Sequence, residues 1–425
     1  MAVGDVTSVV LPIAMVAMLG RAVGDHALLV RSLYLPMELI YVAIQLAFSV
    51  SGQVSAAIGF GARRKDEVAA QTAGLAVLWA ALGAAMALAL WFMAPHLATV
   101  LGVGLGEHDD FVALVRWSAI CHPLLAVPVL SSAALRGAGR PKASTALTAI
   151  GSVLELGTVA FLGVGGGLGA NAIPVAFAVG GVGSGTLGVF LMRRAGLWPT
   201  GGFELGPQVR RALGRLTSVG VPVCLSYVVL SISNFVLLSL LGPLGPTVQA
   251  GYANALTLQT FITAPGVVLG SATAILMNQQ RGAGRESESG RTFQAGLKIC
   301  AVVYIPLAAA AWLGRDWLGW LSTTDPAIHA ETARFLAIVG PTYVILGLTL
   351  LALTAIEQIG MGVLATVLNL VYFIGITAIG GWAARAGNSS LGLYWTVAAF
   401  NLSALAGVVS ITLLVRRRSG EVTAS

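Results

Sequence analysis

Residues 116–123 read RWSAICHP, and residues 334–341 read RFLAIVGP. Four of the eight positions are identical, an aromatic residue follows the arginine in both copies, and both copies lie in long apolar stretches. The two copies stand in opposite halves of the chain, at roughly corresponding places. A segment that recurs at such a distance indicates an internal repeat, so other segments are expected to match at a similar offset.

Two further pairs of segments match at nearly the same offset. They are FGARRKDE (60–67) with RGAGRESE (281–288), and LRGAGR (135–140) with IEQIGM (356–361). Their glycines and charged residues are typical of polar turns at the ends of helices. Three matches at nearly one offset predict that the chain consists of two homologous halves.

The composition predicts an integral membrane protein. Hydrophobic residues make up 57% of the chain and charged residues only 10%, whereas a soluble domain carries about 25% charged residues. Apolar runs of about 20 residues, the length that crosses a bilayer as a helix, recur along the chain. The twelve predicted spans are 4–20, 28–58, 68–93, 110–134, 142–163, 169–191, 213–241, 248–278, 292–313, 329–355, 362–383 and 390–415. The alternation typical of a membrane β-barrel is absent from the sequence.

The predicted fold is therefore all-α, with twelve transmembrane helices in two six-helix lobes. The lobes are residues 1–205 and 206–425, with a linker at about 192–212. Six spans per half keep one orientation, so the halves are parallel repeats related by an axis along the membrane normal. The linker sequence fits an amphipathic stretch on anionic lipid equally well.

The distribution of basic residues predicts the orientation in the membrane. If the loop after the second span is cytoplasmic, 17 Lys and Arg residues lie on that side and three on the other. Both termini are then cytoplasmic, in the inner membrane of a bacterium. The expected partners are the bilayer and a small organic substrate, with no nucleic acid, and the expected state is a monomer.

The GARRKDE and GAGRESE turns after spans two and eight, and LRGAGRPKAS after span four, together resemble the multidrug and toxic compound extrusion (MATE) family. The resemblance implies a V-shaped bundle with a central cleft between the lobes. It also implies alternating access and the export of organic, often cationic, molecules driven by H⁺ or Na⁺. Lipid-linked glycan flippases share this architecture, so a flippase is the alternative function.

Glu155, in SVLELGTVAF, is the expected proton-coupling residue. A carboxyl group at membrane depth is a functional candidate, and apolar surroundings favour its neutral form. The alternative is a neutral carboxyl that only bonds a neighbouring helix. The resemblance also places a carboxylate here, but Gly151, Val16 and Pro174 replace other polar residues of the family pattern. Since a sodium site needs several oxygen ligands, H⁺ is expected rather than Na⁺, and Asp5 is a second coupling candidate.

Polar residues on the predicted spans are candidates for lining the substrate cleft. They are Glu38, Tyr41, Gln45, Gln53, Asn234, Tyr252, Asn254 and Gln259. For the tyrosines, the glutamines and Asn254, polar contact between helices is the alternative interpretation. For Glu38, the alternative is a place at the outer interface.

Other charged residues in the spans favour structural roles. Glu357 is expected to be a solvated charge at a helix end. Arg116 and Arg334 are expected to reach the lipid headgroups, with an ion pair to Asp110 or Glu331 as the alternative. His122 is expected to donate a hydrogen bond between helices, with a proton relay as the alternative.

Enzymatic and cofactor-binding functions find no support in the sequence. HExxH, a Walker A lysine and a nucleophile with a nearby histidine are all absent from it. The three cysteines have no ligand spacing, so neither a disulfide nor a metal site is expected. The sequence thus predicts a secondary active exporter without a cofactor.

Overall fold

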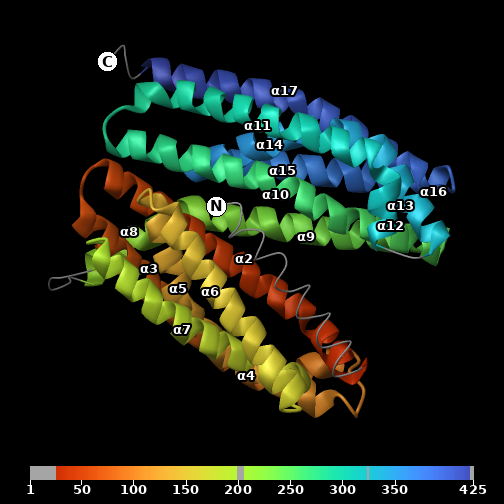
Figure 1. Ribbon diagram of the computed structural model, residues 1–425, viewed down its shortest axis with the longest axis horizontal. Coiled ribbons are helices and arrows are strands. Elements are labelled where there is room, and N and C mark those ends of the chain that lie inside the picture. The colour runs from red at the N-terminus through yellow and green to blue at the C-terminus, as the bar shows by residue number, and fades with distance from the viewer. Residues whose placement is uncertain (1–24, 199–204, 323–324, 422–425) are drawn as a thin grey trace. The chain divides into compact units, whose positions relative to one another are not determined.

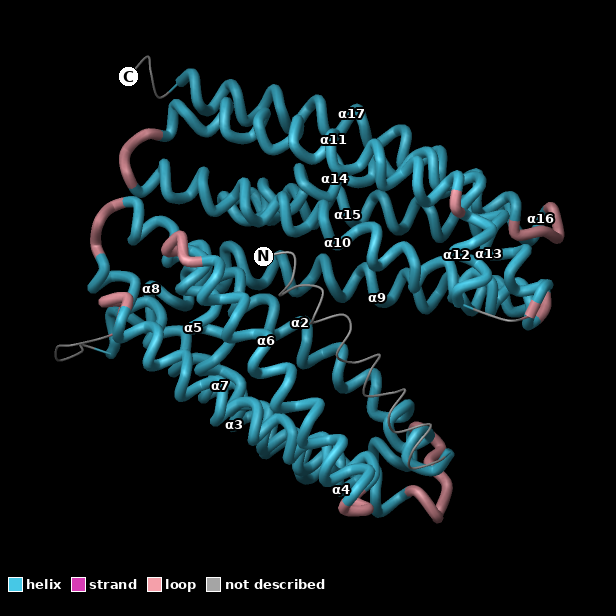
Figure 2. The backbone as a smooth tube through the Cα atoms, viewed as in Figure 1, coloured by secondary structure: helices cyan, strands magenta, loops and turns pink. Residues whose placement is uncertain are grey.

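A computed structural model describes residues 25–198, 205–322 and 325–421, and every regular element in these ranges is a helix (Figure 2). A helix satisfies all of its backbone hydrogen bonds internally, as a lipid environment requires. Ten helical stretches in these ranges are long and apolar enough to cross a membrane. The all-α integral membrane fold predicted from the sequence is therefore confirmed.

The ten stretches fit the twelve predicted spans. The predicted first span, residues 4–20, lies outside the described residues. One stretch, Pro326–Ala386, has 61 residues and is broken at Gly360. Since about 20 residues cross the hydrocarbon core, this stretch is long enough for two crossings.

The chain forms two compact units, Met1–Val221 and Pro222–Ser425. Figure 1 colours the first unit from red to yellow-green. Its helices are α2 (Asp25–Gly61), α3 (Lys65–Val100), α4 (His108–Cys121), α5 (Ala126–Gly137), α6 (Pro141–Thr158), α7 (Ala172–Arg194) and α8 (Leu205–Arg215). Short helical turns continue some of them, namely η1 (His122–Leu125), η2 (Val159–Gly165), η3 (Gly169–Asn171) and η4 (Leu216–Gly220).

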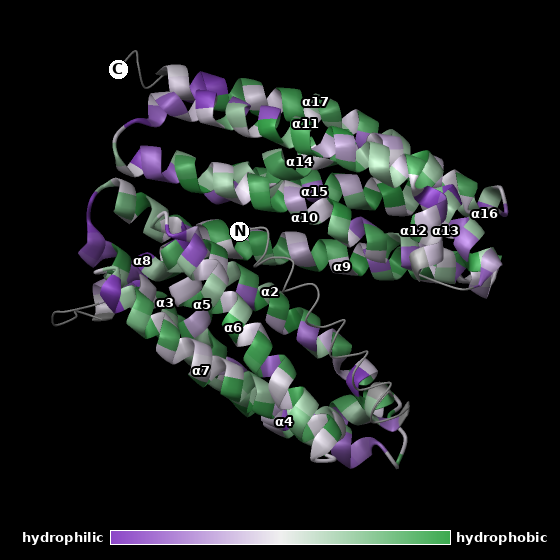
Figure 3. Cartoon of the chain, in the orientation of Figure 1, coloured by the Kyte–Doolittle hydropathy of each residue, from purple (hydrophilic) through white to green (hydrophobic). Residues whose placement is uncertain are grey.

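The second unit is coloured from green to blue in Figure 1. Its helices are α9 (Val221–Leu241), α10 (Pro246–Gly282), α11 (Ser289–Leu313), α12 (Arg315–Ser322), α13 (Pro326–Val339), α14 (Tyr343–Ile356), α15 (Gly362–Gly375), α16 (Gly381–Ala386) and α17 (Leu391–Glu421). The short turns are η5 (Gly242–Leu244), η6 (Glu286–Glu288), η7 (Gly340–Thr342), η8 (Glu357–Met361) and η9 (Ile376–Gly380). The hydropathy colouring in Figure 3 shows apolar residues along the helices of both units and polar residues gathered near the turns.

The two units repeat the same backbone breaks at the offset found in the sequence. Gly139 and Gly360 occupy equivalent positions in the matched segments, and both have positive φ, at 72° and 95°. Glycine adopts this conformation at little cost, and it commonly ends a helix there. The quoted segments repeat the backbone in the same way, since 3₁₀ turns with Pro123 and Pro341 as second residue begin at His122 and Gly340.

Candidate functional site

Glu155 lies on α6, and its side chain packs against Gly180 of α7. A Cβ atom at Gly180 would lie 2.6 Å from Cγ and 2.9 Å from Oε1 of Glu155. Any larger residue at position 180 would therefore occupy the place of the carboxyl group. The glycine provides the space in which this half-buried side chain lies between the two helices.

The Glu155 carboxyl has no hydrogen-bond or ion-pair partner among residues 25–198, 205–322 and 325–421. A hydroxyl one turn further along α7, that of Ser184, donates to the backbone carbonyl of Gly180 in its own helix. Gly151, one turn before Glu155, lies against the same Ser184, because a Cβ there would be 3.3 Å from the hydroxyl oxygen. Within the described chain, nothing supports the alternative that Glu155 bonds a neighbouring helix.

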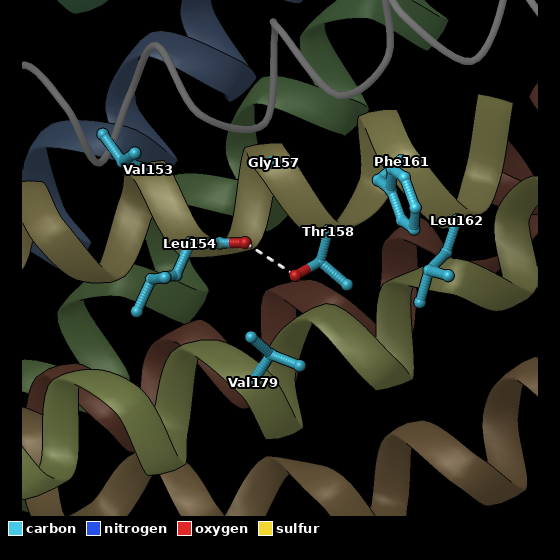
Figure 4. A pocket seen from close by; sticks show the side chains of 7 residues that line it. All are labelled: Val153, Leu154, Gly157, Thr158, Phe161, Leu162 and Val179. Atoms are coloured by element: carbon cyan, nitrogen blue, oxygen red, sulfur yellow. Dashed lines mark hydrogen bonds between the residues drawn. The ribbon is translucent and has the colours of Figure 1, made fainter. Parts of the chain in front are cut away.

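Near Glu155 in sequence, residues of α6, η2 and α7 line an apolar hollow of about 300 Å³ (Figure 4). It is lined by Val153, Leu154, Gly157, Thr158, Phe161, Leu162 and Val179. The single hydroxyl group in the lining, that of Thr158, donates to the carbonyl of Leu154 at 2.7 Å. The hollow therefore offers almost only apolar contact.

Three aromatic rings contact one another in the same unit. The rings of Tyr41 on α2 and His122 are 4.0 Å apart and stacked, and Phe177 of α7 meets the imidazole edge at 5.7 Å. His122 is 6% exposed. In the described part of the chain it contacts rings and makes no hydrogen bond, so the expected interhelical donor is not found.

Glu38 forms an ion pair with Arg31 on the same helix, α2. Arg31 is 2% exposed, and the Glu38 side chain is 18% exposed. Pairing offsets the high cost of each charge at membrane depth. Arg31 is not among the residues predicted from the sequence, although its spacing of seven from Glu38 places both on one helix face.

Asp110 ties three elements of the first unit together. It accepts a hydrogen bond from Asn171 at 3.1 Å and pairs with His26 at 2.9 Å. Arg116 instead donates from Nε to the carbonyl of Trp91 at 2.9 Å, and its guanidinium lies 5.0 Å from that ring. The alternative of an Arg116–Asp110 ion pair is wrong.

The second unit contains a buried carboxylate with several donors. Glu331 is 4% exposed and accepts hydrogen bonds from Tyr394 at 2.8 Å, from Ser390 and from Arg334 at 2.6 Å. The Arg334–Glu331 ion pair, which the sequence left open, is present. This network joins α13 to the start of α17.

Glu357 is buried, with 8% exposure, so the expectation of a solvated helix end is wrong. The hydroxyl of Ser226 on α9 donates to Glu357 Oε1 at 2.8 Å, and Asn369 on α15 donates to that hydroxyl at 3.2 Å. The physical reason is the turn η8, in which Gly360 redirects the chain and leaves Glu357 among helices.

The predicted cleft residues lie in different surroundings. Tyr252 is 1% exposed and packs on Phe335 and Tyr394, and Asn254 donates to Thr332 at 3.3 Å. Gln53 is also buried, whereas Gln45, Gln259 and Asn234 are half-buried. Asp5 lies outside the described residues. A role of these residues in substrate binding stays a prediction.

The model of the MatE family matches residues 1–160 and 222–383, which is more than half of the chain. Among solved structures, the chain is similar to an outward-facing multidrug resistance MATE family transporter of the MOP superfamily, with a TM-score of 0.88 and 17% identity over 100% of this chain and 95% of the other. It is also similar to a mutant of the Vibrio cholerae MATE transporter VcmN, with a TM-score of 0.90 and 15% identity over 98% and 95% of the two chains.

A third similar structure is a MOP superfamily transporter from Pyrococcus furiosus, with a TM-score of 0.87 and 17% identity over 100% of this chain and 94% of the other. None of the curated proteins matches this chain. At these identities the structural likeness shows the fold, and the family model assigns the family. The chain belongs to the MatE family of multi-pass membrane transporters.

Proposed function

We propose that this protein is a secondary active exporter that exchanges protons for an organic, often cationic, substrate by alternating access. The observation that carries the proposal is the Glu155 carboxyl. It lies between α6 and α7 against Gly180, and no basic side chain of the described chain is within ion-pair distance of it.

Protonation strongly changes the free energy of a carboxyl group in this position. Its charged form lacks a counter-ion in apolar surroundings, and this costs free energy that a bound proton removes. Na⁺ would need several oxygen ligands, but the neighbouring positions are Gly151 and Gly180, and the Ser184 hydroxyl is used by its own helix. The surroundings therefore favour a proton over sodium.

Proton and substrate are expected to oppose each other in binding. If the charged carboxylate favours the state that holds a cationic substrate, a proton bound at Glu155 weakens substrate binding. Linkage requires the substrate to weaken proton binding by the same factor. A pH gradient then drives export as the two ligands exchange.

The orientation of the chain in a bacterial inner membrane is part of this proposal. The clusters of Lys and Arg at alternate loops favour cytoplasmic termini. A monomer is proposed because each unit has its own buried core.

A lipid-linked glycan flippase is the alternative, and it requires cationic groups for a pyrophosphate. Arg31, which is the buried arginine among the described residues of the first unit, is already neutralised by Glu38. This pairing disfavours the alternative.

The test is dye movement driven by a pH gradient in inverted vesicles, with Glu155→Gln compared with the unaltered protein. We expect Glu155→Gln to bind a cationic dye but to lose its response to the gradient. Glu286→Gln is the matched control, because Glu286 lies in an exposed ion pair with Arg281 at 3.2 Å. Equal responses of the unaltered protein and Glu155→Gln would contradict the role of Glu155.

A further inference from the structure

Among the described residues, a buried carboxyl of the other unit, that of Glu357, lacks the ion pair that the buried Glu331 forms with Arg334. Glu357 lies in the turn η8 between α14 and α15, with 8% exposure. Its Oε1 accepts from Ser226 of α9, and that hydroxyl accepts from Asn369 of α15. A neutral chain of two hydrogen bonds thus runs from Asn369 of α15 through Ser226 of α9 to the carboxylate.

No positive charge compensates Glu357 within the described residues. The turn packs against α10, α14 and α15, and Ser226 brings α9 to it. The titratable or charged residues on these four helices are Cys224, Tyr227, Tyr252, Arg281, Tyr343 and Tyr372. Of these, Arg281 pairs with Glu286 at 3.2 Å, and Tyr372 donates to Asn401 at 2.5 Å. None of the six forms an ion pair or hydrogen bond with Glu357.

The repeat shows that the position suits a polar contact between helices but does not require a carboxylate. Arg136 stands at the position of the first unit that matches Glu357, and it donates to Ser49 of α2 at 3.1 Å. Both residues stand three positions before the positive-φ glycine, Gly139 or Gly360. One unit therefore carries a permanently charged arginine here, whereas the other carries a group that can gain and lose a proton.

The donors around Glu357 favour a proton as the ligand rather than a metal cation. A cation such as Na⁺ needs several oxygen atoms, and the hydrogen bonds of Glu357 to the described residues supply the carboxylate and one hydroxyl. The third group, the Asn369 amide, presents its nitrogen to that hydroxyl. A proton needs only the carboxylate.

We propose that Glu357 is a second proton-binding site, separate from Glu155, and that Ser226 and Asn369 pass its charge state to α9 and α15. The charged form accepts the Ser226 hydrogen bond, and hydrogen bonds to a charged acceptor are about twice as strong as neutral ones. Binding of a proton weakens this link between η8 and the two helices. The proposal rests on the proposed proton antiport for its use in transport, although binding of the proton is measurable without transport.

The test is infrared difference spectroscopy of the purified protein during a pH titration, which detects the carbonyl stretch of a protonated carboxyl. The comparison is made in Glu155→Gln, so that Glu155 contributes no signal. We expect a band that disappears at alkaline pH and is missing in Glu155→Gln/Glu357→Gln. In Glu155→Gln/Ser226→Ala, the band shifts in frequency because its hydrogen-bond partner is gone. Identical difference spectra with and without Glu357 would overturn the proposal.

Measurements of transport distinguish a failure of this inference from a failure of the proposed function. We expect Glu357→Gln to retain transport driven by a pH gradient but to exchange fewer protons per substrate. An unchanged ratio would overturn the role of Glu357 in coupling. If the unaltered protein shows no gradient-driven transport at all, the proposed function fails, whereas the spectroscopic result still decides whether Glu357 binds a proton.

Discussion

Gly180 and Glu155 form a matched pair across α6 and α7, in which the missing side chain of one leaves room for the carboxyl of the other. A Cβ at position 180 would lie 2.6 Å from Cγ of Glu155, closer than such atoms pack. The place of the carboxyl is therefore set by a neighbouring helix as well as by its own. This relationship makes the site sensitive to a single methyl group.

We expect Gly180→Ala to displace the Glu155 carboxyl. Overpacking of this kind costs about 1–3 kcal/mol, so the unfolding temperature in detergent falls and the response of transport to a pH gradient weakens. Gly157→Ala is the control on the same helix as Glu155, because no atom of the described residues lies within 4 Å of a Cβ there. Equal transport by the two variants would show that the position of the carboxyl does not matter.

The Arg31–Glu38 pair gives a prediction about stability. Arg31→Gln leaves Glu38 without its partner, and loss of one member of a buried pair costs about 3–5 kcal/mol. The variant in which both residues are glutamine removes both charges, so we expect it to unfold at a higher temperature than Arg31→Gln. Thermal unfolding of the single and double variants measures the coupling. If the single and double variants are equally stable, the two charges do not depend on each other.

The sequence alone is sufficient to predict the helices and the internal repeat. Hydropathy over about 20 residues is a local signal, and it predicted the membrane helices. The sequence likewise predicts a turn at Gly139, in LRGAGRPK, and Gly139 and the matching Gly360 both have positive φ. These features depend on neighbours along the chain, so a sequence alone contains them.

The surroundings of the buried charges were not predictable in the same way. The sequence predicts a solvated helix end at Glu357, but the residue is buried and accepts a hydrogen bond from Ser226 of α9, which lies far earlier in the chain. Arg31 is not among the residues predicted from the sequence, because its burial depends on which face of α2 packs against other helices. The gap at Gly180 that receives Glu155 depends on how α6 and α7 pack. Such properties come from tertiary packing.

Tyr394 provides the last prediction, since its hydroxyl donates to the buried Glu331 at 2.8 Å. Tyr394→Phe removes one donor to a charged acceptor, a change that costs about 1.5–3 kcal/mol, so we expect a clear fall in the unfolding temperature. Tyr343→Phe is the matched control in the same unit, because the buried Tyr343 hydroxyl has no hydrogen-bond partner within the described chain. The loss of a hydroxyl group is the same change in shape in both variants, and the difference between them reports the hydrogen bond to Glu331. If both variants lose equal stability, the Glu331 network contributes nothing beyond packing.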